Sequence, residues 1–177
     1  MIDAVKDDAL GTDDVMDILH RLRRRDVSAD ELARAAEARI EGVNHQLNAV
    51  VTKVDLPVAD GPFAGIPTAI KDNQDLVGYP TRHGSSATAD TPQREDMPFV
   101  AHFRSLGFAP LVKTTLPEFG LTPSTESTTY GATRNPWNPG HSAGGSSGGS
   151  AALVASGARP IAHANDGGGS IRIPAAV

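Results

Sequence analysis

Two glycine- and serine-rich segments, residues 144–150 and 166–170, have the composition of loops that could do chemistry. Glycine lets the backbone approach a ligand closely and point consecutive N–H groups at one atom. Such a nest holds a phosphate, or the oxyanion that develops when a nucleophile attacks a carbonyl group. A phosphate-binding P-loop has a lysine directly after its glycines, and neither segment does. We therefore favour the oxyanion.

Serine is the candidate nucleophile in both segments, because an oxyanion forms only when some group attacks a carbonyl carbon. Residues 144–148 match the G-x-S-x-G pattern of a nucleophile elbow, but the residues before them make a poor strand. Ser170 has the better context, since it follows a predicted strand and three glycines and precedes a predicted helix. Open α/β sheets place their sites at that end of a strand. The candidate nucleophiles are Ser146, Ser147, Ser150 and Ser170, and the N–H groups that could face the oxyanion belong to Gly167, Gly168, Gly169 and Ser170.

A serine hydroxyl is a weak nucleophile and needs a base to accept its proton. None of the six histidines lies in a motif that marks it as that base. A lysine can serve instead if burial keeps it neutral near pH 7. Lys71 is the plausible lysine because it ends a short apolar stretch, although a surface lysine at a strand end is the alternative interpretation. Asp72 would oppose the required shift unless its side chain points away.

The elements that must position these residues alternate between helix and strand. Thr12 is a candidate N-cap for the first helix, and Ser28 with Glu31 forms a capping box that starts the second. Gly107 is a natural helix stop. This alternation favours an α/β sheet with parallel strands. The predicted helices are 12–25, 28–45, 99–106, 151–155 and one starting at 171; the predicted strands are 49–54, 68–71, 110–113 and 160–164.

Composition limits the class of protein. The chain has 177 residues, a length typical of one domain, and a formal charge of −5, which argues against a nucleic-acid or anionic-membrane binder. Cysteine is absent, so disulfides, cysteine nucleophiles and thiolate metal sites are excluded within this sequence. No apolar run approaches the length of a membrane span, and residues 1–10 do not resemble a secretory signal. We expect a cytoplasmic protein.

Three segments together resemble the amidase signature family of serine amide hydrolases. They are residues 65–72 (GIPTAIKD), 131–150 and 166–175 (DGGGSIRIPA), and they occur in the family's order. The resemblance covers most of the chain from residue 63 onward. It implies an α/β fold in which helices cover a mixed sheet. Family members are usually more than twice as long, so residues 1–177 would be the N-terminal part of a single domain, with a helical segment at 1–48 and part of the catalytic core at 49–177.

The resemblance also implies a catalytic group, a Ser–Ser–Lys triad. Carried over by position, Lys71 is the base, Ser146 the bridging serine and Ser170 the nucleophile, and the Gly145–Ser146 peptide is expected to be cis. The implied reaction is hydrolysis of a linear or cyclic amide through an acyl-enzyme, without a cofactor or metal. Further residues expected to orient the site are Ser147, Ser150, Asp166 and Arg172.

Departures from the family's motifs bear on the substrate. Ala164-Asn165-Asp166 stands where Gly-Thr-Asp is common, which looks more like the branch that contains bacterial nylon-oligomer hydrolases. One alternative function is the amidase-like subunit of a glutamine-dependent amidotransferase, which typically has Asp-Glu-Phe where this chain has Pro117-Glu118-Phe119. A non-catalytic anion-binding module is the other alternative.

The expected partners follow from the same resemblance. They are a small amide substrate and the C-terminal remainder of the enzyme, which could be a separate chain. A homodimer is left open, and neither nucleic acid nor membrane is expected.

Overall fold

The central sheet of the computed structural model, which describes residues 1–177, has three strands. They are β1 (Val50–Lys53), β2 (Pro67–Lys71) and β3 (Ala109–Thr114), in the order β1-β3-β2. β2 pairs parallel to β3, and β1 pairs antiparallel to β3, so the sheet is mixed. The prediction of parallel strands is therefore wrong for β1. The connection from β2 to β3 contains a helix, and such a crossover allows the two neighbouring strands to run parallel. The connection from β1 to β2 contains no helix.

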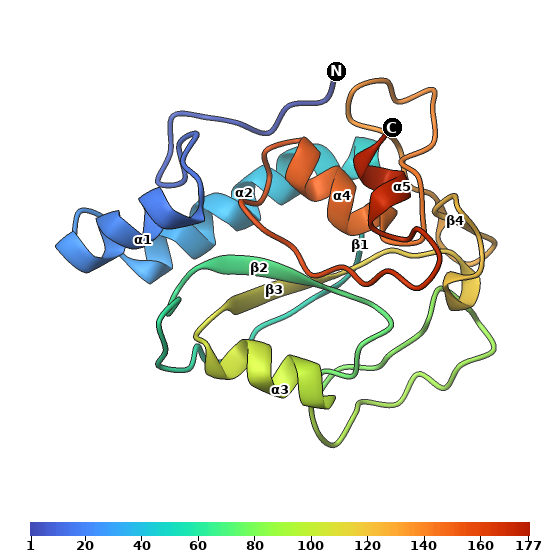
Figure 1. Cartoon of the computed structure of the whole chain (residues 1–177), viewed down its shortest axis with the longest axis horizontal. Helices are drawn as coiled ribbons and strands as arrows, with labels where there is room; N and C mark the ends of the chain where they lie inside the picture. The colour runs from blue at the N-terminus through green and yellow to red at the C-terminus, as the bar shows by residue number, and fades with distance from the viewer.

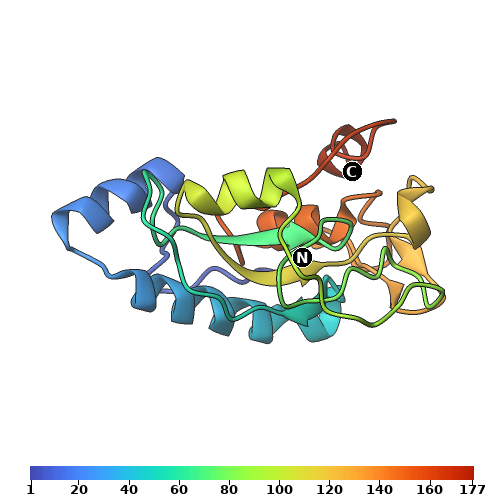
Figure 2. The same ribbon diagram turned by 90° about the horizontal axis from the view of Figure 1, so that it is seen from below.

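Helices lie on both faces of this sheet. In Figures 1 and 2, α2 and α3 lie on opposite sides of the strands, and Figure 2 shows α5 projecting from the body of the molecule. The short strands β4 (Glu126–Ser127) and β5 (Gly131–Ala132) form a separate hairpin. The helices are α1 (Val15–Arg24), α2 (Ala29–Leu47), α3 (Pro98–Ser105), the short 3₁₀ helix η1 (Glu118–Gly120), α4 (Gly148–Ala155) and α5 (Arg172–Ala175).

The helix starts follow from local hydrogen bonding. The Ser28 hydroxyl accepts from the Glu31 N–H, and the Glu31 carboxylate accepts from the Ser28 N–H, which confirms the predicted capping box. The predicted N-cap of α1 is wrong, because Asp14 rather than Thr12 caps it. The Asp14 carboxylate accepts from the N–H groups of Met16 and Asp17, and it also faces the positive end of the helix dipole.

Residues 160–164 are extended beside β2 but do not form a regular strand, so that predicted strand is wrong. The His163 N–H donates to the Ala69 carbonyl at 2.8 Å, and the Lys71 N–H donates to His163 Nδ1 at 3.3 Å. A side chain thus accepts where a strand would offer a carbonyl group. Pro160 also lacks an N–H. The segment still follows β2 to the site.

The core has a layer on each face of the sheet. Ala69 and Val112 pack with residues of α2 and α4, while Ile70 faces a second cluster that includes Val100 of α3. α4 approaches the sheet closely, since a Cβ at Gly149 would lie 2.4 Å from Thr115 Oγ1. The glycines of the first segment therefore serve partly to let α4 pack. None of the helices combines the length and apolar character that crossing a membrane requires.

Candidate active site

Lys71 is the last residue of β2, and its side chain is almost completely buried, with 1 % exposed. The ammonium nitrogen Nζ lies 2.8 Å from Ser146 Oγ, 2.9 Å from Ser147 Oγ and 2.8 Å from Asn165 Oδ1. Residues distant in sequence therefore meet at one nitrogen. The apolar sheet on which Lys71 sits keeps water away from this nitrogen.

The two serines form a continuous line of hydrogen bonds with Lys71. Ser146 Oγ lies 2.8 Å from Ser170 Oγ, so the three predicted triad residues are brought together. The Gly145–Ser146 peptide bond is cis, as the resemblance implied. The Ser147 N–H donates to the Ser170 carbonyl at 3.2 Å and ties the two loops together. Ser170 is half-buried and is reached from solvent, whereas Ser146 is buried.

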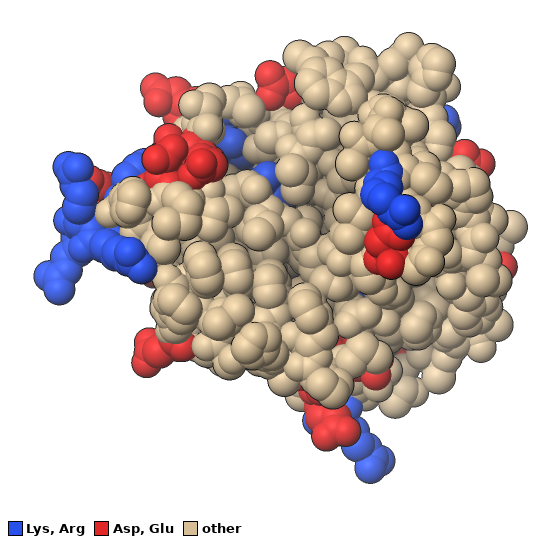
Figure 3. Space-filling model, viewed as in Figure 1, with Lys and Arg blue, Asp and Glu red and all other residues tan.

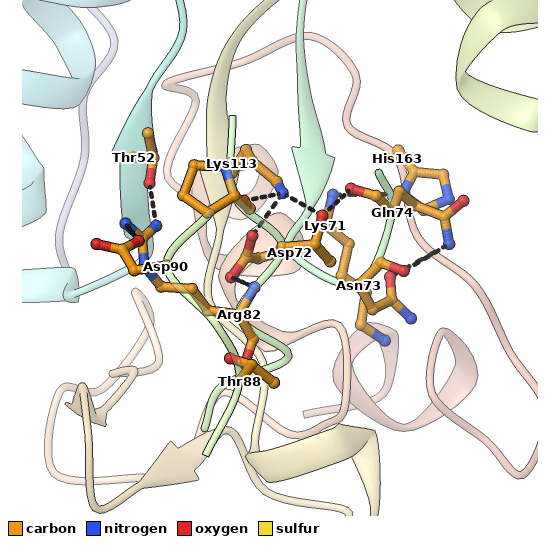
Figure 4. A network of polar contacts seen from close by, with 12 residues as sticks. Thr52, Lys71, Asp72, Asn73, Gln74, Arg82, Thr88, Asp90, Lys113 and His163 are labelled. Carbon is orange, nitrogen blue, oxygen red and sulfur yellow. Dashed lines mark hydrogen bonds and ion pairs between the residues drawn. The ribbon is translucent and has the colours of Figure 1, made fainter. Parts of the chain in front are cut away.

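Burial of the ammonium group lowers the pKa of Lys71 to about 8, and the charge of Asp166 opposes that shift. Asp72, the adjacent acid, does not contact Lys71. In Figure 4 the two side chains leave the end of β2 in different directions, and Asp72 meets Lys113 instead. The sequence did not show whether the Asp72 side chain points toward Lys71. Because it points toward Lys113, it does not oppose the lowered pKa of Lys71.

Asp72 and Lys113 form an ion pair that is completely buried, with 0 % of either side chain exposed and 2.7 Å between Lys113 Nζ and Asp72 Oδ1. Lys113 Nζ also donates to the Pro80 carbonyl and the Thr81 hydroxyl. Burial raises the pKa of Asp72, and the charge of Lys113 opposes that rise. This pair was not predicted from the sequence. The only hint in the sequence was Lys113 at the end of the predicted strand 110–113, and a lysine is almost never fully buried without a partner.

We expect Lys113→Met to lower the free energy of unfolding by about 3–5 kcal/mol, because it leaves the Asp72 carboxylate buried without a counter-charge. Urea denaturation measures this loss. The double variant Asp72→Asn with Lys113→Met removes both charges and should recover most of the stability. As a control, Lys53→Met alters an exposed lysine of β1 and should leave the denaturation midpoint unchanged. A double variant no more stable than the single one would contradict the importance of charge pairing at this position.

The second loop is clamped by Asp166. Its carboxylate accepts from the Gly169 N–H at 2.7 Å and pairs with the Arg172 guanidinium at 2.8 and 2.9 Å. The hydrogen bond from Arg172 holds the pKa of Asp166 well below its usual range. Because the Gly169 N–H donates to Asp166, it is not free to stabilise an oxyanion together with the neighbouring N–H groups. The expectation that Gly169 contributes to the oxyanion hole is therefore wrong for this structure. The N–H groups of Gly167, Gly168 and Ser170 have no hydrogen-bond partner.

The predicted orienting residues divide in two. Ser147 contacts Lys71 directly, and Asp166 with Arg172 clamps the second loop. Ser150 makes no hydrogen bond to Lys71, Ser146 or Ser170, and its hydroxyl donates instead to the His163 carbonyl at 2.7 Å. Ser150 thereby holds the segment that runs beside β2.

Two further residues at the site were not predicted from the sequence. Asn165 accepts from Lys71 Nζ, and the sequence signal was present, since Asn165 is one of the departures from the common motif. His163 accepts from the Lys71 N–H through Nδ1. Burial lowers the pKa of His163 to about 4, with the Lys71 charge adding to the shift, so its ring is neutral at pH 7. No motif marked it, because its role depends on a contact with β2.

Comparisons with known proteins identify relatives of this chain. The family model described as Amidase matches residues 18–177. AmiC of Mycobacterium tuberculosis (strain ATCC 25618 / H37Rv), which is named as an amidase, is 43 % identical over 184 residues, covering 99 % of this chain and 39 % of the relative. The 6-aminohexanoate-cyclic-dimer hydrolase of Paenarthrobacter ureafaciens is 41 % identical over 166 residues, covering 88 % of this chain and 34 % of the relative. The chain thus spans about two fifths of the length of the first of these curated relatives.

Solved structures give the same result. A structure of 6-aminohexanoate cyclic dimer hydrolase superimposes with a TM-score of 0.87 at 39 % identity, covering 97 % of this chain and 37 % of that chain. A glutamyl-tRNA(Gln) amidotransferase subunit from Thermotoga maritima superimposes with a TM-score of 0.83 at 32 % identity, with the same coverage.

Proposed function

Because this chain belongs to the amidase family, we propose that it carries the catalytic residues of an amide hydrolase that cleaves a carboxamide C–N bond through an acyl-enzyme on Ser170. The observation that most supports this function is the unbroken line of hydrogen bonds from Lys71 through Ser146 to Ser170. Ser146 lies within hydrogen-bond distance of both Lys71 and Ser170, which a proton transfer in two steps requires.

The contacts of Lys71 favour one direction of proton transfer. A neutral amine has two N–H donors and one lone pair. Asn165 Oδ1 can only accept, and the Ser147 hydroxyl already donates to the Asn165 carbonyl at 3.3 Å, so both accept from Lys71. These two contacts use both N–H groups of the neutral amine. The lone pair is then directed at Ser146, whose hydroxyl hydrogen can rotate toward it.

The first half of the reaction follows from this arrangement. Lys71 takes a proton from Ser146, and Ser146 takes one from Ser170 as Ser170 Oγ bonds to the amide carbon. The N–H groups of Gly167, Gly168 and Ser170 are the donors available to the tetrahedral oxyanion. One such donor is worth about 3–4 kcal/mol of transition-state stabilisation in related chemistry. The amine leaves with a proton returned through Ser146, and water then hydrolyses the acyl-enzyme.

Turnover of a panel of carboxamides tests the proposed activity. The panel should include the cyclic dimer of 6-aminohexanoate, because a hydrolase of that compound is among the relatives. The expected result is release of one carboxylate and one amine per amide bond cleaved. Glutamine-restricted activity that depends on partner subunits would instead indicate the amidotransferase function. Failure to cleave any amide or to react with a fluorophosphonate would favour the anion-binding module. Intact-mass analysis of the native protein reports whether a second polypeptide accompanies this chain.

A further inference from the structure

Thr125 is a buried threonine whose hydroxyl joins the two ends of the loop that carries the bridging serine. This loop, residues 144–148, is called the serine loop below. Only 1 % of Thr125 is exposed. Its hydroxyl donates to the Gly144 carbonyl at 2.8 Å and accepts from the Gly148 N–H at 3.0 Å. One side chain therefore satisfies backbone groups at both ends of the serine loop.

The chain around Thr125 also packs directly against the serine loop. A Cβ on Gly145 would lie 2.8 Å from the carbonyl carbon of Ser124, and a Cβ on Gly148 would lie 2.3 Å from Thr125 Oγ1. A larger residue at either position would push the two segments apart. The two glycines thus allow the serine loop to reach the hydroxyl that holds it.

Thr125 is in turn anchored to the central sheet. Its carbonyl accepts from the Thr133 N–H at 2.9 Å. The Thr133 hydroxyl donates to the Asn48 carbonyl at 2.8 Å and shares a hydrogen bond of 2.7 Å with the Thr115 hydroxyl. Thr115 directly follows β3, the strand that pairs with β2. The serine loop is therefore connected through Thr125 to the same sheet that carries Lys71.

Given the proposed function, on which this inference rests, we propose that Thr125 is a positioning residue, which holds the serine loop so that Ser146 and Ser147 lie against Lys71. Both serine hydroxyls are within 2.9 Å of Lys71 Nζ. A misplacement of about 1 Å at reacting groups can lower the rate on the order of a hundredfold. The two ends of the serine loop must therefore be held, and the Thr125 hydroxyl is bonded to both of them.

Valine has nearly the shape of threonine but no hydroxyl. The variant Thr125→Val therefore leaves the Gly144 carbonyl and the Gly148 N–H without their partner, and both glycines are buried. An unsatisfied buried polar group is costly, so the serine loop is expected to shift until these groups reach water. Serine keeps the hydroxyl and loses only a methyl group, so Thr125→Ser should leave the serine loop in place.

The environment of Lys71 provides a measurement that does not depend on turnover. Burial lowers the pKa of Lys71 to about 8. A shifted serine loop would admit water, and the pKa would rise toward its ordinary value. The serine loop and α4 carry no titratable side chain, and Figure 3 shows mostly uncharged atoms where Figure 1 places α4. The titratable groups near Lys71 on the other elements are His163, Asp166 with Arg172, and the buried pair of Asp72 and Lys113. None of them hydrogen-bonds to Thr125, so the substitution leaves their contacts unchanged.

Two measurements on the native protein test this role. Thr125→Val should lower kcat for the best carboxamide about a hundredfold with little change in KM, because the substitution displaces the proton path. In a titration of ¹³C-labelled lysine followed by NMR, it should also raise the pKa of Lys71, whose signal is identified by its loss in Lys71→Met. Thr125→Ser should retain most of the kcat and the low pKa. Thr68→Val, which removes another buried hydroxyl that donates to the Ile161 carbonyl at 3.3 Å, is the matched control and should change neither quantity.

The outcomes separate this role from the proposed function. Wild-type kcat and an unchanged Lys71 pKa in Thr125→Val would overturn the positioning role and leave the amide hydrolase intact. A Thr125→Ser protein with the losses expected for valine would also overturn it, and this result decides the matter if Thr125→Val does not fold. If the wild type cleaves no amide, the proposed function fails. A Lys71 pKa raised in Thr125→Val but not in Thr125→Ser would then still support the hold of Thr125 on the serine loop.

Discussion

Replacing Ser170 with alanine is expected to lower kcat for amide hydrolysis by about a million-fold, the effect seen when the nucleophile of a serine hydrolase is removed. The physical reason is that Ser170 Oγ supplies the only bond to the acyl group, and no acyl-enzyme forms without it. The loop itself should keep its structure, because Asp166 and Arg172 clamp it independently of the hydroxyl. Initial rates with the best carboxamide of the panel measure the change.

The control for this variant is Ser105→Ala, which removes an exposed hydroxyl at the end of α3 and should leave kcat unchanged. Equal Tm values for the Ser170→Ala and wild-type proteins would show that the loss is chemical. A Ser170→Ala protein that retained a hundredth of the wild-type kcat would contradict the assignment. That result would indicate that Ser146 or Ser147 is the nucleophile instead.

Replacing Lys71 with methionine should lower kcat/KM by roughly 10⁴-fold, at the upper end of what a general base contributes. Methionine fills a similar volume but cannot accept the proton of Ser146. The more informative variant is Lys71→Arg. It keeps a cation at the end of β2, but a guanidinium does not lose its proton in proteins and so cannot act as the base. We therefore expect Lys71→Arg to be as inactive as Lys71→Met.

Rates at pH 7 and pH 9 give the comparison, with Lys53→Met as a control at an exposed lysine. If the positive charge of Lys71 served only to hold the loops together, Lys71→Arg would recover much of the activity. That recovery would contradict the proposed proton path, whichever serine is the nucleophile.

Much of the site could be predicted because short motifs contain it. Residues 65–72 place Lys71 at a strand end, and the two glycine-rich segments place Ser146 and Ser170 in loops next to helix starts. Local chemistry also determined the start of α2, since the capping box involves only residues close in sequence. In these cases the signal and the structure lie within one short stretch of chain.

The rest depends on contacts between distant residues, which periodicity does not reveal. A pattern shows which face of a strand is buried but not that Asp72 meets Lys113 there, or that His163 accepts from the Lys71 backbone. Whether β1 runs parallel or antiparallel to its neighbour likewise depends on its pairing with β3, which is distant in sequence. The engagement of the Gly169 N–H depends on how Asp166 turns back on its own loop.

The rate at which a fluorophosphonate labels Ser170, followed by peptide mass spectrometry from pH 6 to pH 10, tests the central claim most directly. With a Lys71 pKa of about 8, about one molecule in ten has the neutral amine at pH 7. Labelling of Ser170 alone, about tenfold faster on the alkaline plateau than at pH 7, is the predicted result. Label on another serine, or a rate at Ser170 that does not change across this range, would contradict a neutral lysine acting through Ser146.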